Sequence, residues 1–205
     1  VSLGKYVWNW NMEPGRVNYL EITGAELPHD IKWDVTKTDG SENIKTLVGR
    51  TGKKVEFKPV KSDAGRVFEI TVTLKDGYSQ TFAVACKYVR REFRELTDED
   101  RDAYFSAMRT IYTVKTLEGR ETYGKDYTGS DVFITMHLGA MTLEDCTPWH
   151  DSEVFVTAHS AFNLMMEKAL QSVHDTVALH YWDYTIDDYQ YDTQWATKSP
   201  IFDND

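Results

Sequence analysis

The stretch from His150 to Leu170, HDSEVFVTAHSAFNLMMEKAL, decides the fold of the second part of this chain. Asp151 and Ser152 are residue types that favour helix N-caps, so we expect a helix to begin there. Apolar side chains then recur at helical spacing and predict one buried face. The members of that face are Ala158, Phe162, Met165, Met166 and Ala169. His159 lies on this helix, and His150 lies just before it.

The histidines around this helix form a candidate metal site. Two residues nine positions apart on one straight helix point about 180° apart, so His150 and His159 can share a metal only if His150 lies outside the helix. His137, on a preceding helix expected over residues 131–141, can supply a third nitrogen. Three neutral imidazoles suit copper and zinc alike. Spacing alone also allows a plainer interpretation, in which these are separate core or surface histidines.

The first part of the chain has the pattern of short strands. Apolar and polar residues alternate over residues 67–74 and 79–86, on either side of a turn that holds Asp76 and Gly77, which predicts a hairpin with one buried face. Further strands are expected at VNYLEI (17–22), IKWDV (31–35) and KKVEF (53–57). We therefore predict an antiparallel, β-sandwich-like domain over residues 1–86, in which no residue pattern indicates catalysis.

The pattern becomes helical after Cys86. Thr97 precedes three acidic residues, the arrangement of an N-cap followed by a first turn that opposes the helix dipole. Residues 115–130 are polar and contain glycine, so we expect a loop there, and we expect an irregular tail after Tyr184. The fold class is thus α+β, with a helical domain over residues 87–205.

Composition excludes two classes of partner. The chain has 23 basic and 33 acidic residues, a formal net charge of −10, and no long basic face for phosphate, so nucleic acid is not expected. No run approaches the roughly 20 apolar residues that span a bilayer. The two cysteines, Cys86 and Cys146, are enough for one bridge and too few for a disulfide scaffold.

Taken together, the motifs of the second domain resemble the first copper half-site of the family of tyrosinases, catechol oxidases and molluscan hemocyanins, the type 3 copper proteins. In that family a histidine is followed by a phenylalanine, a second histidine, a glutamate and a Tyr-Trp-Asp motif. The matching residues here are His150, Phe155, His159, Glu167 and Tyr181-Trp182-Asp183. Upstream, YVRREFRELTDEDRDAYFSAM (88–108) also resembles the family, so the resemblance extends from Cys86 to the end of the chain.

This resemblance implies roles for particular residues. It implies that one copper ion is held by His137, His150 and His159, that Phe155 packs against the site, and that Glu167, Trp182 and Asp183 are structural. The complete site holds two copper ions, of which this chain binds one. We expect the remaining half of a helical bundle in the same or another chain, and we expect this chain to be truncated before it. His174 and His180 are expected to be surface or structural residues.

The chain departs from the family pattern at three positions near the site. The family usually has Trp before the third ligand, Arg after it, and Pro before Tyr-Trp-Asp, where this chain has Ala158, Ser160 and His180. These positions support the fold rather than bind metal. Cys146 is a further open question. Family members often join a cysteine in this region to the second histidine as a thioether, and the alternatives for Cys146 are a disulfide with Cys86 or a free thiol.

The function implied by the resemblance is dioxygen binding and oxidation of phenols or catechols to quinones, as in a tyrosinase or catechol oxidase, provided that the second copper half-site is supplied. Two alternatives belong to other classes: an oxygen carrier of hemocyanin type, and a structural or assembly subunit that keeps the fold without the chemistry. The expected small-molecule partners are dioxygen and phenols. By resemblance alone, the protein is expected to be secreted or to lie in an organelle lumen.

Overall fold

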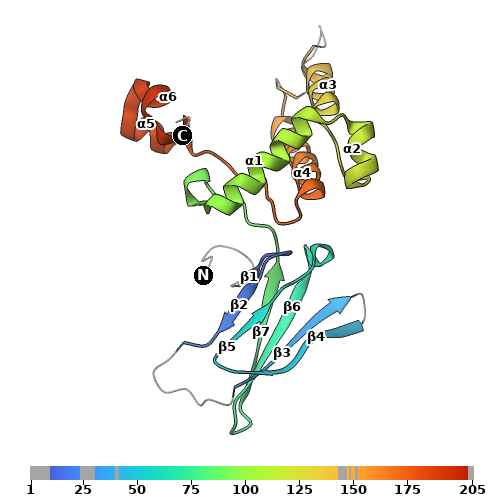
Figure 1. The fold of residues 1–205 in the computed structure, drawn as a ribbon, viewed down its shortest axis with the longest axis vertical. Coiled ribbons are helices and arrows are strands. Elements are labelled where there is room, and N and C mark those ends of the chain that lie inside the picture. The colour runs from blue at the N-terminus through green and yellow to red at the C-terminus, as the bar shows by residue number, and fades with distance from the viewer. Residues whose placement is uncertain are drawn as a thin grey trace. The chain divides into compact units, whose positions relative to one another are not determined.

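The computed structural model describes residues 10–23, 31–39, 42–142, 147, 149–150 and 152–202. The chain divides into two compact units, Val1–Val89 and Arg90–Asp205. Strands make up the first unit, called the β unit here, and helices make up the second, called the helical unit (Figure 1). The α+β class predicted from the sequence is therefore confirmed.

The β unit contains two sheets. The larger has the strand order β1-β7-β6-β3-β4, and the smaller pairs β2 with β5. The strands are β1 (Asn11–Met12), β2 (Asn18–Glu21), β3 (Lys32–Asp39), β4 (Glu42–Thr51), β5 (Lys54–Phe57), β6 (Val67–Thr73) and β7 (Ser79–Cys86), and a short 3₁₀ helix, η1, covers Lys61–Asp63. β1 pairs with β7 in parallel, which corrects the expectation of a purely antiparallel unit, and β4 was not among the predicted strands.

The predicted hairpin is confirmed as β6 and β7, in which Phe68 lies opposite Val84 and Ile70 opposite Phe82. Gly77 has a φ of 87° in the turn, a conformation that favours glycine. Both sheets contribute to one apolar core, since Val55 and Phe57 of β5 pack with residues of the larger sheet. A mostly apolar cavity of about 490 Å³ opens in this unit, and Trp10, Trp33 and Phe82 are among its lining residues.

The helical unit begins with a short 3₁₀ helix, η2 (Phe93–Glu95). Its helices are α1 (Asp98–Thr113), α2 (Thr116–Tyr123), α3 (Ser130–Met141), α4 (Phe155–Val173), α5 (Tyr184–Tyr191) and α6 (Trp195–Lys198), with further 3₁₀ turns η3 (Asp192–Gln194) and η4 (Pro200–Phe202). Thr97 caps α1 as predicted, because its side chain accepts a hydrogen bond from the Asp100 amide. Tyr104, Ala107 and Ile111 form the buried face of α1.

Three sequence predictions for this unit were wrong. α2 lies where a loop was expected. Gly119 suggested a turn, but the glycine is needed for packing, because a Cβ at this position would lie 2.0 Å from Cε1 of Tyr127 and clash with it. α5 lies in the tail that was expected to be irregular, and the side chain of Asp183 caps it. α4 begins at Phe155, later than Asp151 or Ser152, and its N-cap, Val154, makes no side-chain hydrogen bond.

Within the described part of the chain, none of the helices combines the length and the apolar character that a bilayer span requires. The core of the helical unit draws on α1, α3 and α4 together with Tyr127 and Val177. α3 and α4 therefore pack into the same core. This packing sets the relative position of the two helices that carry His137 and His159.

Candidate metal centre

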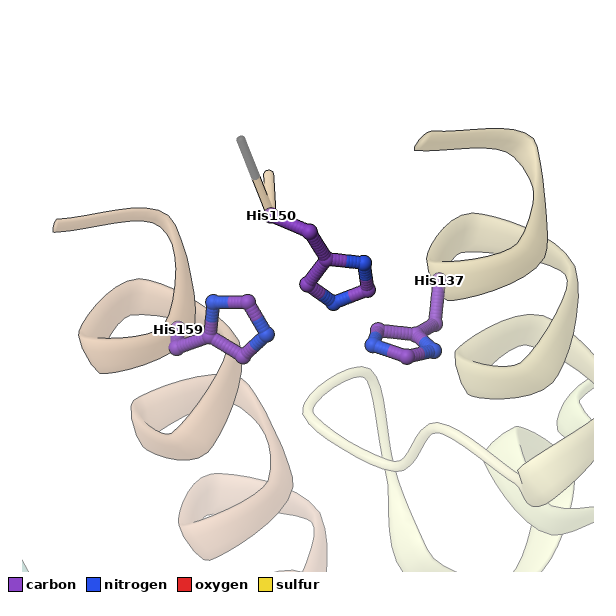
Figure 2. Close-up of side chains that lie close together, drawn as sticks. All are labelled: His137, His150 and His159. Carbon is purple, nitrogen blue, oxygen red and sulfur yellow. The ribbon is translucent and has the colours of Figure 1, made fainter. Parts of the chain in front are cut away.

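Three histidines meet at the ends of α3 and α4. His137 comes from α3, His159 from the first turns of α4, and His150 from the segment before α4; Figure 2 shows the three rings around a common space. One ligand atom from each lies within 4.8 Å of the others. The ring centroids are 5.1 Å apart for His137 and His150, 5.2 Å for His150 and His159, and 5.8 Å for His137 and His159. All three side chains are partly exposed.

The packing of α3 on α4 explains why two of these rings face each other. Phe133 and Phe162 pack edge to face, with centroids 5.4 Å apart. Residues three or four apart lie on the same face of a helix, so His137 follows Phe133 on α3 and His159 precedes Phe162 on α4 on the faces that already meet. The aromatic pair thus brings the two histidines together.

His150 reaches the same space from outside the helix. Its backbone N–H donates to the Thr147 carbonyl at 2.9 Å, which closes a turn just before the ligand position. Since α4 begins at Phe155, His150 and His159 are not on one straight helix. Two residues nine positions apart on one helix would point in opposite directions, and this arrangement lets them face the same space instead.

The hydrogen bonding of His159 selects one of its nitrogens for a ligand. Nδ1 of His159 lies 2.8 Å from the Phe155 carbonyl oxygen. A carbonyl only accepts hydrogen bonds, so Nδ1 carries the proton and Nε2 keeps a free lone pair. Three imidazoles at this spacing form a nitrogen donor set that fits one borderline metal ion such as copper.

Aromatic rings surround the three histidines. Phe155, which the sequence predicted to pack against the site, lies 4.4 Å from His159 and 6.3 Å from His150 between ring centroids. Trp149 lies 6.3 Å from His137 and 6.0 Å from His159, and Phe162 lies 5.9 Å from His137. Sequence analysis did not identify Trp149 as a site residue, although its position next to His150 was an available signal.

Glu167 lies on α4 away from the histidine group and links three segments. Its carboxylate accepts from Arg90 Nε at 2.7 Å and from the Leu179 backbone N–H at 2.8 Å. Glu167 is buried, so these bonds replace the water that the carboxylate would otherwise bind. The contacts tie α4 to the start of the unit and to the segment that leads into Tyr-Trp-Asp.

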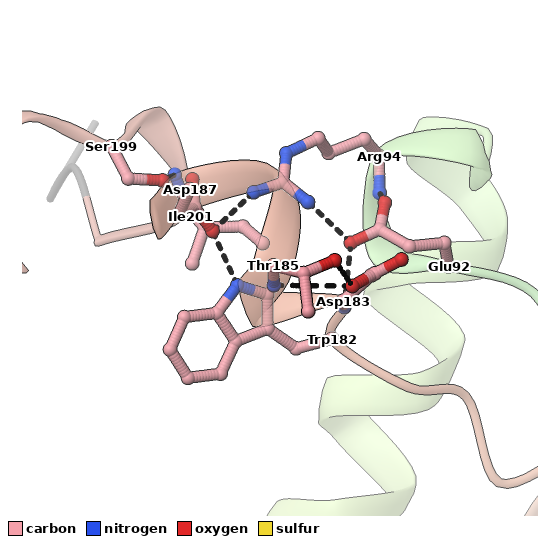
Figure 3. A network of polar contacts seen from close by, with 8 residues as sticks. All are labelled: Glu92, Arg94, Trp182, Asp183, Thr185, Asp187, Ser199 and Ile201. Atoms are coloured by element: carbon pink, nitrogen blue, oxygen red, sulfur yellow. Dashed lines mark hydrogen bonds and ion pairs between the residues drawn. The ribbon is translucent and has the colours of Figure 1, made fainter. Parts of the chain in front are cut away.

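A second polar cluster forms around Asp187 (Figure 3). The Asp187 carboxylate accepts hydrogen bonds from the Arg94 guanidinium and from Trp182 Nε1, and Arg94 also pairs with Glu92. Asp183 accepts from the Thr185 amide at 3.1 Å. Burial alone would raise the pKa of Asp187, but hydrogen bonds from Arg94, Ser199 and Trp182 outweigh it and lower that pKa to about 2. Sequence analysis missed Asp187 and its partner Arg94.

The other histidines of the helical unit lie outside the metal group. His180 is 5% exposed; its Nδ1 accepts from the Arg91 backbone N–H at 3.1 Å, and its ring packs against Tyr104. Nδ1 of His174 lies 3.1 Å from the Thr176 hydroxyl. Their contacts are those of a packed residue and a surface residue.

The two cysteines differ in what the structure describes. Cys86 is a buried free thiol at the end of β7, and burial, with a smaller contribution from the charge of Asp63, raises its pKa to about 12. It is therefore unreactive as a nucleophile at neutral pH. Cys146 lies outside the described residues, so its chemical state stays a prediction.

Comparisons with known proteins bear on the helical unit. Residues 127–204 match the family model for the common central domain of tyrosinase, a range that includes all three histidines of the group. No curated protein matches this chain. A solved structure of a predicted glycoside hydrolase from Bacteroides vulgatus is 13% identical, with a TM-score of 0.21; the match covers 50% of this chain and 26% of that one, and it carries no argument about fold or function. This part of the chain, which includes the histidine group, is thus similar to the central domain of tyrosinases.

Proposed function

We propose that the helical unit supplies the first copper half-site of a type 3 copper oxidoreductase that oxidises phenols or catechols to quinones. The observation that carries this proposal is the set of three imidazole ligand atoms within 4.8 Å of one another, inside the segment that matches the tyrosinase model. His137, His150 and His159 would hold one copper ion, and a second ion would complete the site.

Copper would supply one-electron redox chemistry toward dioxygen at this site. For a catechol the reaction balances when two substrate molecules each lose two electrons and two protons and one dioxygen becomes two waters. The residues of this chain act as ligands and as a frame. His159 presents Nε2 because its Nδ1 is held by the Phe155 carbonyl. The Phe155 ring packs on that of His159, with the two centroids 4.4 Å apart.

The remaining half of the copper domain, in the same or another chain, would cover apolar surface next to the histidines. Ile134, Leu138 and Met141 recur at helical spacing on α3 and are exposed, the first two by 52% and 50%. Leu164 and Met165 of α4 are exposed as well, which corrects the prediction that Met165 lies on the buried face of this helix. Apolar side chains gathered on two neighbouring helices are typical of an interface. We propose that helices carrying a second histidine trio pack there and complete a bundle.

The finer assignments of fold and location belong to the same proposal. The shared core of the two sheets supports a sandwich-like β unit. The packing of α1, α3 and α4 around one core supports a partial helical bundle. Secretion or an organelle lumen rests on the family resemblance alone.

The test is oxidation of a catechol by the copper-loaded protein together with the rest of its copper domain. Turnover is measured by the uptake of dioxygen and by the absorbance of the quinone. The proposal expects turnover that is lost in His150→Ala. Reversible dioxygen binding without turnover would instead support an oxygen carrier. A folded protein that takes up no copper would support a structural subunit. A His174→Ala variant is the matched control, because that histidine lies outside the metal group.

A further inference from the structure

The three imidazoles of the metal group are not held in the same way. The ring of His159 is fixed by its hydrogen bond to the Phe155 carbonyl. In the described part of the chain, no hydrogen bond holds a ring nitrogen of His137 or His150. Metal-binding histidines generally owe their orientation to a hydrogen bond on the second nitrogen. His137 therefore needs another means of keeping its ring turned toward the other two.

Aromatic packing provides that means. The His137 ring meets Trp149 at an interplanar angle of 65° and Phe162 at 37°. Trp149 also meets His159 at 66° and Phe162 at 70°, with the last pair 5.6 Å apart between centroids. The three contacts of Trp149 are edge to face, an arrangement that is favourable and specifies ring orientation. The indole thus touches two ligands, one from α3 and one from α4, and the phenylalanine beneath them.

We infer that Trp149 is a positioning residue, which holds His137 in its ligand orientation by ring packing in place of a hydrogen bond. The position of Trp149 in the chain adds to this role. Because Trp149 directly precedes His150, packing of its indole also holds the backbone next to that ligand. Trp149 touches the ligands and is not itself a ligand.

The consequence for metal binding rests on the proposed function. An imidazole that rotates freely must lose that freedom when it binds a metal, whereas a packed imidazole has already lost it. Removing a residue that orients a ligand typically lowers metal affinity about 10- to 100-fold. We expect Trp149→Ala to weaken cuprous ion binding by about 10-fold, and Trp149→Phe, which keeps an aromatic ring, to recover most of the affinity.

The first test needs no metal. In the metal-free protein, NMR signals of the His137 ring, assigned by comparison with His137→Asn, should carry ring-current shifts from Trp149 and Phe162. Trp149→Ala should move them toward the values of a freely rotating histidine and leave the His174 ring signals unchanged. Unchanged His137 signals in Trp149→Ala would overturn the inference, whether or not the protein binds copper.

The second test is a double-mutant cycle on cuprous affinity, measured by competition with a coloured chelator. If Trp149 acts through His137, the loss caused by Trp149→Ala should shrink to near zero in a His137→Ala background. A full loss in both backgrounds, or no loss in either, would contradict the inference and leave the proposed function standing. A wild-type protein without copper affinity would refute the proposed function, and the NMR test would still decide the role of Trp149.

Phe105→Ala serves as the matched control for a lost aromatic ring in the same unit. Phe105 packs on Phe93 and Tyr104, and among the described residues the ring contacts of these two do not include the metal group. Its removal should change thermal unfolding without changing cuprous affinity. An equal loss of affinity in Phe105→Ala would show that general loosening, rather than positioning of His137, explains the effect of Trp149→Ala.

Discussion

The histidine group and the cluster around Asp187 both gather polar side chains from segments far apart in sequence, yet they differ in what those side chains still need. At Asp187, the carboxylate is 0% exposed, and its Oδ2 accepts hydrogen bonds from both Arg94 and Trp182. At the histidine group, the side chains are partly exposed and Nε2 of His159 keeps a free lone pair. The charge of Asp187 is paired with Arg94 inside its own cluster, as expected of a structural contact. The histidine group instead brings three possible ligand atoms within 4.8 Å of one another, as expected of a metal site.

The largest expected effect that separates the two clusters is on metal affinity. His159→Ala removes one of three donors and also the ring held by Phe155, so copper affinity should fall by about 100-fold or more. Thermal unfolding of the metal-free protein should change little, since the side chain is only partly buried. Isothermal titration with copper, alongside calorimetry of the metal-free form, checks both. If His159→Ala bound copper as tightly as the wild type, the histidine group would not be the metal site that distinguishes it from the Asp187 cluster.

A substitution in the Asp187 cluster is expected to lower the stability of the protein without removing a metal ligand. Asp187→Ala leaves the Arg94 guanidinium without its buried partner, which should lower the melting temperature of the helical unit by roughly 10 °C. Arg101→Ala, which breaks the exposed pair with Asp98, should lower it by about 2–4 °C or less. Helical circular dichroism during heating measures both variants. Equal shifts would mean that the burial of the Asp187 pair does not matter.

A smaller effect is expected on the stability of the folded protein at acidic pH. The pKa of Asp187 is lowered from its ordinary value of 3.8 to about 2, so its ionised form stabilises the folded state above pH 3.8, and this contribution is lost as the pH falls toward 2. The stability difference between wild type and Asp187→Asn should therefore shrink across that window. Urea unfolding at a series of pH values tests this, and a difference that is constant down to pH 2 contradicts it.

The smallest expected effect is at a histidine outside both clusters. His174→Ala should leave copper affinity unchanged, because the contact of its ring nitrogen is with Thr176 and not with the metal group. The same copper titration, carried out on His174→Ala, tests this prediction. A marked loss of affinity would mean that the ligand set extends beyond His137, His150 and His159.

The sequence was most informative where structure is local. The cap at Thr97 and the β6–β7 hairpin depend on local sequence patterns, and both were predicted. The gathering of the three histidines was expected from the family resemblance, whereas spacing alone left two interpretations open.

The predictions failed where a distant contact decides the structure. Gly119 looked like a loop residue, but it exists to admit the Tyr127 ring against α2. Arg94 and Asp187 are 93 positions apart, so no local pattern joins them. Trp149 stands next to His150 in the sequence, but only the folded geometry places its ring against His137 and His159.

Copper K-edge X-ray absorption on the copper-loaded protein tests the central claim most directly, because it reports which atoms surround the metal. A first shell with three imidazole nitrogens, falling to two in His159→Ala and unchanged in His174→Ala, is the predicted result. A shell of sulfur or carboxylate oxygen, or one that His159→Ala leaves unchanged, would contradict the assignment of His137, His150 and His159 as the ligands of one copper ion.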